Sequence, residues 1–153
     1  MAAKLTWIEA ELHRLRGVAQ LDDTARELVF QKAAQSTWEQ LMRDARADVE
    51  EFNRSGNEVE FTETSPLGFH VTRAAVELVV AADLANHSIR YDYHSEKAEA
   101  SPEGGIFSLR LSRYGRVHLY SADERLSAEE ARRMLLEPVL FPENISPLEP
   151  STK

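Results

Sequence analysis

The segment that decides the fold is IFSLRLSRYGRVHLYS, residues 106–121. Its side chains alternate between apolar and polar on both sides of the central RYG. Because successive side chains of a strand point to opposite faces, this alternation predicts two strands with one buried and one polar face. The apolar set is Phe107, Leu109, Leu111, Val117 and Leu119, and the polar set is Ser108, Arg110, Ser112, Arg116, His118 and Tyr120.

The connection between these two strands follows from the same alternation. A two-residue turn would place Leu111 opposite His118 and mix the faces, whereas a three-residue loop places Leu111 opposite Val117. Such a loop ends on a residue in the left-handed region, which suits Gly115. We therefore predict a hairpin with a loop over residues 113–115.

The period of two also runs through residues 58–95. The turns are expected at residues 65–68 and 85–86, and the break in alternation over residues 72–76 predicts a bulge or an irregular corner. A two-residue turn at 85–86 pairs Val80 with Tyr91 and Leu78 with Tyr93 inside the core, and Glu77 with His94 on the outer face. The acidic segment 58–63 is typical of an exposed edge strand, and a second possibility is contact with the basic hairpin of another subunit.

Three segments are predicted helices: residues 7–16, 25–54 and 128–136, the last ending before Pro138. Each follows the capping-box spacing S/T-x-x-E, formed by Thr6 and Glu9, Thr24 and Glu27, and Ser127 and Glu130. The second helix would be roughly 45 Å long, whereas a six-residue strand spans about 20 Å. Either it bends near residues 36–37 or its apolar stripe overhangs the sheet, and an overhang favours cover by a second copy.

Together these elements predict an α+β domain of two layers over residues 1–141. N-terminal helices, one of them long, and a short C-terminal helix accompany an antiparallel meander of five to six strands. The apolar residues 139–141 are expected to dock on the core. Residues 142–153 contain three prolines and are predicted to be a disordered tail.

Composition restricts the classes of function. The 153 residues carry a net charge of −8 and no cysteine, which excludes disulfides and thiolate metal sites. Net negative charge opposes general binding to nucleic acid or anionic membranes. The N-terminus has neither a signal peptide nor a membrane span, so we expect a cytoplasmic protein. Signatures of nucleotide, metal and nucleophile sites are missing, and no pair of histidines has ligand spacing, so no metal or cofactor is expected.

The polar sheet face is the candidate site. Residues 106–121 hold three arginines and no acid, and guanidinium groups suit carboxylates and phosphates, while histidine can transfer protons near neutral pH. The plainer interpretation is a solvated sheet face. The candidate ligand-binding residues are Arg90, His94, Arg110, Arg116, His118 and Tyr120.

Three functions follow as hypotheses. The first is a non-catalytic interaction module, an adaptor or chaperone-like protein, that is dimeric or binds a protein partner. The second is a binding protein for a small anionic or amphiphilic ligand, held on the polar face or between helix and sheet. The third is a small enzyme that uses His94 or His118 with Arg110 and Tyr120, which requires these side chains to converge in a pocket.

Overall fold

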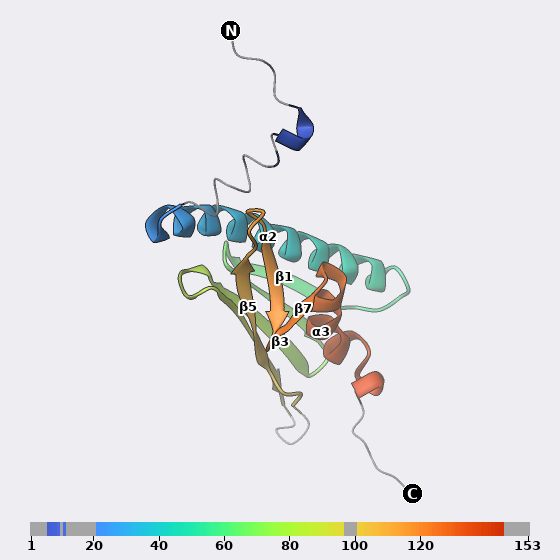
Figure 1. Ribbon diagram of the computed structural model, residues 1–153. Helices are drawn as coiled ribbons and strands as arrows, with labels where there is room; N and C mark the ends of the chain where they lie inside the picture. The colour runs from blue at the N-terminus through green and yellow to red at the C-terminus, as the bar shows by residue number, and fades with distance from the viewer. Residues whose placement is uncertain (1–5, 10, 12–20, 97–100, 146–153) are drawn as a thin grey trace, which may run out of the picture.

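The computed structural model describes residues 6–9, 11, 21–96 and 101–145 of the chain. It shows the predicted α+β architecture, with helices packed against one antiparallel sheet (Figure 1). The helices are α2 (Asp23–Asn53) and α3 (Ala128–Leu140), with short 3₁₀ helices η1 (Leu84–Asn86) and η3 (Pro142–Ile145). The strands are β1 (Glu60–Ser65), β2 (Gly68–Arg73), β3 (Val76–Asp83), β4 (Ser88–Ser95), β5 (Gly105–Leu111), β6 (Val117–Ser121) and β7 (Glu124–Leu126).

The sheet is a meander in which each strand pairs with the next, in the order β1 to β7. Leu111 pairs with Val117, and Gly115 has a φ of 81°, so the three-residue loop is confirmed. The predicted register of β3 and β4, including Glu77 opposite His94, is also confirmed. The meander has seven strands rather than five or six, because the short strand β7 was not predicted.

Two connections differ in detail from expectation. Of the bulge or corner expected over residues 72–76, the structure shows a corner: Arg73 pairs with Val76, and Ala74 with Ala75 forms a two-residue hairpin turn. The alternation breaks there because the chain reverses direction. The turn between β3 and β4 is longer than two residues, since η1 and His87 separate the two strands.

The sheet curves around the middle of α2. The hydroxyl of Thr37 donates to the carbonyl oxygen of Val117 at the start of β6, at 3.4 Å. The indole Nε1 of the next residue, Trp38, donates to the carbonyl oxygen of Pro66 in the turn between β1 and β2, at 2.8 Å. Because adjacent helix residues reach strands near opposite ends of the sheet order, the sheet must bend around the helix.

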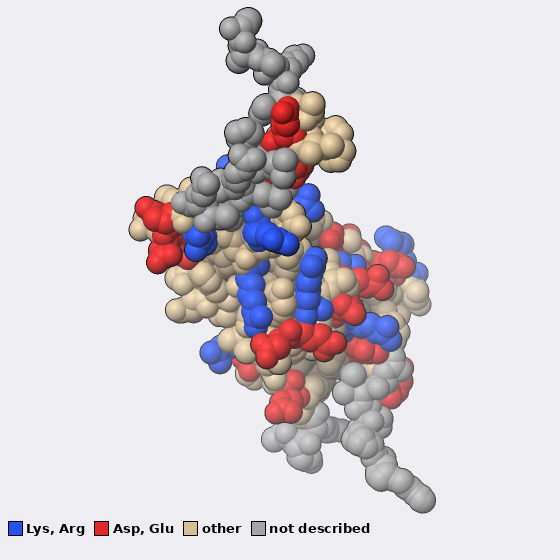
Figure 2. All heavy atoms as spheres, in the orientation of Figure 1, with Lys and Arg blue, Asp and Glu red and all other residues tan. Residues whose placement is uncertain are grey.

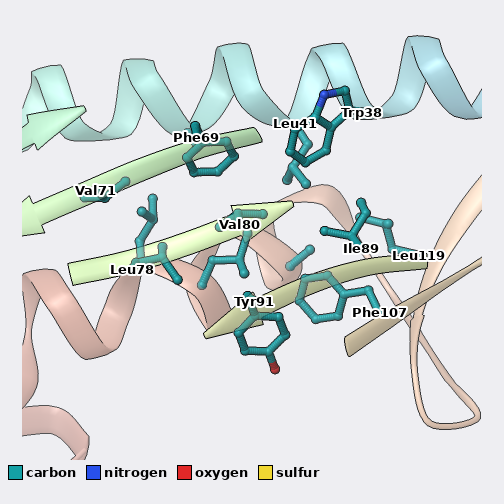
Figure 3. Close-up of a cluster of buried hydrophobic side chains, with 14 of the residues drawn as sticks. Trp38, Leu41, Phe69, Val71, Leu78, Val80, Ile89, Tyr91, Phe107 and Leu119 are labelled. Carbon is teal, nitrogen blue, oxygen red and sulfur yellow. The ribbon is translucent and has the colours of Figure 1, made fainter. Parts of the chain in front are cut away.

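The concave side of this curve holds the hydrophobic core (Figure 3). Trp38 and Leu41 of α2 face side chains from five strands. These side chains fill the space between helix and sheet. The labelled strand residues are Phe69, Val71, Leu78, Val80, Ile89, Tyr91, Phe107 and Leu119.

The helix starts follow the capping predictions in two of three cases. Thr6 with Glu9, and Ser127 with Glu130, form reciprocal capping boxes. The helix α2 instead begins one residue after Asp22, whose carboxylate accepts from the backbone N–H of Ala25 at 2.8 Å. Because Asp22 is the N-cap residue, Thr24 lies inside the helix and does not form a capping box with Glu27. The carboxylate of Glu27 contacts Gln31 and His87 instead. Most of the predicted helix 7–16 lies outside the described residues.

The helix α3 does not stop before Pro138 but continues to Leu140. A proline inside a helix lacks the N–H that would bond to the carbonyl four residues earlier, here that of Met134. The hydroxyl of Tyr93 on β4 shares its one proton between this carbonyl oxygen, at 3.1 Å, and that of Leu135, at 2.7 Å. The sheet thus supplies the donor that Pro138 lacks, and burial raises the pKa of Tyr93.

The helix α3 also covers the C-terminal half of α2. Arg132 of α3 lies 2.7 Å from Asp48 and 3.8 Å from Asp44, both on α2. Part of α2 therefore extends past the strands, as one of the two alternatives expected, and α3 of the same chain covers it. This overhang does not require a second copy as cover. Of the residues after α3, Phe141 contacts Phe52 edge to face, and residues 146–153 of the predicted tail lie outside the described part.

Candidate functional site

Strands β5, β6 and β7 bring a group of basic side chains together on the outer face of the sheet (Figure 2). The register places Arg110 opposite His118 and Tyr120 opposite Arg125. Arg116 stands two residues before His118. We call this group the arginine face: Arg110, Arg116, His118, Tyr120 and Arg125.

Arg110 is held in place by three contacts. Its guanidinium lies over the ring of Tyr120, 4.3 Å from the ring centre. Nη2 also donates to the carbonyl oxygen of Ala122 at 3.1 Å and lies 3.2 Å from the carboxylate of Asp123. Because Asp123 is itself fully exposed, this ion pair is screened by water and can exchange for another carboxylate.

Arg116 and Arg125 differ from Arg110 in having no acidic partner. Within the part of the chain that the structure describes, neither guanidinium lies within 4.0 Å of a carboxylate. Both arginines are close enough to His118 to affect its charge. The pKa of His118 is lowered by burial and then by the charges of Arg125 and Arg116. Two of the three arginines of this face therefore have no carboxylate of the described residues within ion-pair distance.

Two of the predicted site residues lie away from this group. Arg90 on β4 is opposite Ile106, four residues and about 13 Å along β5 from Arg110. His94 lies beyond Tyr91, where the described pairing of β4 with β5 ends, on the side away from Arg110. The structure therefore brings together Arg110, Arg116, His118 and Tyr120, and leaves Arg90 and His94 separate.

Two histidines outside the arginine face, His70 and His87, contact glutamates of the same chain. Glu77 is opposite His94 in the register, but its carboxylate lies 2.8 Å from Nδ1 of His70 on the neighbouring strand. His87, in the connection between β3 and β4, is half-buried: its ring stacks on Phe30 at 3.7 Å, and Nε2 lies 2.9 Å from Glu27. These histidines stabilise local contacts and are not part of the arginine face.

Arg125 is the member of the site that sequence reasoning missed. It was missed because β7 has only three residues, too few for alternation to be visible. The available signal was the turn at Ala122 and Asp123: a two-residue connection there pairs Leu119 with Leu126 inside and Tyr120 with Arg125 outside, as observed.

Two hollows on the described surface are lined by other residues. One, of about 590 Å³, lies between α2 and α3 over Phe52, Leu136 and Leu140. The other, of about 460 Å³, lies beside the N-terminal half of α2. No group of three or more potential metal ligands occurs among the described residues. The arginine face itself is an exposed surface that lines neither hollow.

Comparison with known proteins found no match among family models, curated proteins or solved structures. Among the described helices, none combines the length and the apolar character needed to cross a bilayer.

Proposed function

We propose that this protein is a non-catalytic interaction module whose arginine face binds an acidic segment of a protein partner. The observation that carries the proposal is the pair Arg116 and Arg125, which have no acidic neighbour within 4.0 Å in the described structure although the chain has a net charge of −8. Guanidinium groups bind carboxylates through paired hydrogen bonds. An uncancelled cluster of this kind steers and orients an acidic partner.

The shape of the site favours an extended partner. Small ligands bind mostly in concave pockets, whereas these side chains stand on an open sheet face. The same exposure disfavours the enzyme hypothesis, because His118 and Tyr120 are not enclosed with a substrate-sized space. The net negative charge disfavours nucleic acid and anionic membranes as partners.

A dimer, a chaperone-like role and a cytoplasmic location stay predictions. Because α3 covers the apolar overhang of α2, a different protein now fits better as the partner than a second copy. Measurement of the molar mass in solution tests the dimer directly.

The test compares two double variants that change net charge equally. Arg116→Glu with Arg125→Glu reverses the charge of the face, and Arg43→Glu with Arg54→Glu makes the same change of charge on α2 and at its C-cap. A fluorescently labelled peptide of alternating glutamate and serine is titrated by anisotropy at roughly 50 mM salt. We expect the face variant to weaken binding by about tenfold or more, and the α2 variant to weaken it by about twofold at most.

Equal losses in the two variants would show that only net charge matters and would contradict the proposal. Failure of the wild-type protein to bind the peptide would contradict it as well. Competition by inorganic phosphate at low millimolar concentration would favour the small-anion hypothesis instead, because a peptide that spans several arginines should resist it.

A further inference from the structure

The most exposed large apolar side chains of the described structure are Trp7, Leu28 and Ile8, at 76%, 68% and 52%. Trp7 and Ile8 belong to a single helical turn that the capping box of Thr6 and Glu9 holds together, with bonds of 2.9 and 3.0 Å. The turn therefore presents a tryptophan and an isoleucine without any cover. Tryptophan in particular is frequent among the residues that dominate protein contacts.

An apolar hollow lies near the start of α2. This lateral groove, of about 460 Å³, is formed by α2, the turn between β1 and β2, and η1. Its apolar lining includes Trp38, Pro66, Leu67 and Leu84, of which Leu67 is 41% exposed. Leu28 stands one helical turn before the lining residue Gln31 and extends the apolar surface along the same side of α2.

The chain between this turn and α2 is long enough for the turn to reach the lateral groove of the same molecule. Residues 12–20 connect Glu11 to Leu21, ten steps that can span up to about 33 Å. The groove begins at Gln31 and ends near Glu39, which is about 14 to 26 Å along α2 from Asp22. The hollow between α2 and α3 begins near Asp48, about 39 Å along the helix, so the connection reaches the nearer groove without full extension and this hollow only when fully extended.

Charge also favours this docking. Glu39 and Asp83 line the lateral groove, and Arg14 and Arg16 stand in the connecting segment. A short tether produces a high effective concentration of the segment, so modest apolar contacts suffice for binding within one molecule.

We propose that the N-terminal segment docks in the lateral groove of its own chain, with Trp7 and Ile8 covering Leu67 and Leu28. Docking removes the most exposed apolar side chains from water and leaves the arginine face open on the other side of the sheet. The segment thus acts as an internal ligand for a second interaction surface, independent of the proposed partner site.

The fluorescence of Trp7 tests this docking in the full-length protein. The chain has two tryptophans, and Trp38 is fully buried, so quenching by acrylamide reports on Trp7; the variant Trp7→Phe supplies the signal of Trp38 alone. We expect Trp7 to be protected in the wild-type protein. Leu67→Glu should increase its quenching severalfold, and Leu28→Glu should do the same from the α2 side.

Ile106→Glu is the matched control, since Ile106 is 49% exposed on the outer sheet face, away from the groove. It should leave the quenching of Trp7 unchanged. Equal quenching in wild type and in both leucine variants would overturn the proposal. Protection that disappears on dilution from roughly 100 to 1 µM would also overturn it, because docking between molecules depends on concentration and docking within one does not.

Discussion

Leu109 and Arg110 are neighbours on β5, yet they belong to different regions of the molecule. Leu109 pairs with Leu119, and both are buried beneath α2 at 2% and 5% exposure. Arg110 pairs with His118 on the outer face, over the ring of Tyr120. The same pair of strands therefore carries part of the hydrophobic core on one face and the proposed binding site on the other. Substitutions on the two faces should have separable effects.

The arginines show the same contrast. Arg132 lies between two aspartates of α2 and joins the helices, whereas Arg116 and Arg125 have no such partners in the described structure. An arginine whose charge is already paired stabilises the fold, and one whose charge is not paired remains available to a partner.

The largest expected effect is on the inner face. Leu109→Ala should lower the free energy of unfolding by about 2 to 5 kcal/mol, because it opens a cavity in a closely packed core. Arg116→Ala, on the outer face, should change it by about 0.5 kcal/mol at most. Urea denaturation of both variants checks the separation, and comparable losses would show that the two faces are not independent.

The contact between Tyr93 and α3 comes next. Tyr93→Phe removes the hydroxyl that donates to the carbonyl oxygens of Met134 and Leu135, and should cost about 1 to 3 kcal/mol of unfolding free energy. The matched control is Tyr91→Phe, whose hydroxyl donates to no carbonyl in the described structure and whose loss should have little effect. Equal thermal midpoints for the two variants would refute this account of how α3 continues through Pro138.

The turn that places Arg125 should respond in the opposite direction. Ala122 has a φ of 54°, a conformation that disfavours any residue with a Cβ. Ala122→Gly should raise the free energy of unfolding by about 1 kcal/mol, while Ala85→Gly in η1 should lower it by about 0.5 kcal/mol. A loss of stability in Ala122→Gly would contradict the strained turn.

The smallest effect concerns pH on the outer face. The pKa of His118 is lowered in the folded protein by burial and by Arg125 and Arg116. The unfolded chain therefore binds more protons, so stability falls as pH drops from about 6.5 towards the folded pKa. His118→Gln should remove this part of the pH dependence in urea midpoints between about pH 7.5 and 5. Arg125→Gln should reduce it, Arg54→Gln should not, and an unchanged dependence in His118→Gln would contradict the prediction.

The alternation of apolar and polar residues was sufficient to predict strand pairing wherever the two kinds of residue lie on opposite faces. It predicted the pairing of Leu111 with Val117 and of Val80 with Tyr91, because a shift of one residue would turn every side chain to the wrong face. It failed to distinguish a bulge from a turn at Ala74, since two alanines carry none of the usual turn chemistry of glycine or asparagine. It also failed at β7, which is too short to show a period.

The candidate site was predicted in part for the same reason. Arg110 and His118 follow from the hairpin itself, and Tyr120 and Arg116 from its continuation. Their separation from His94 depends on where β5 begins, at Gly105 opposite Tyr91. A side chain at Gly105 would approach the Tyr91 hydroxyl to 2.6 Å, so this start is determined by contact between strands.

By itself, the sequence determined the helices, the two faces of the strands and the concentration of arginines on one hairpin, because these depend on residues close together along the chain. Only the tertiary structure decided that α3 covers α2 and continues through Pro138, and that Arg125 joins Arg116 on one face with no carboxylate of the described residues within 4.0 Å of either. Those outcomes depend on groups far apart in the chain, such as Tyr93 and Met134. Local periodicity holds no information on which distant donor will meet which acceptor.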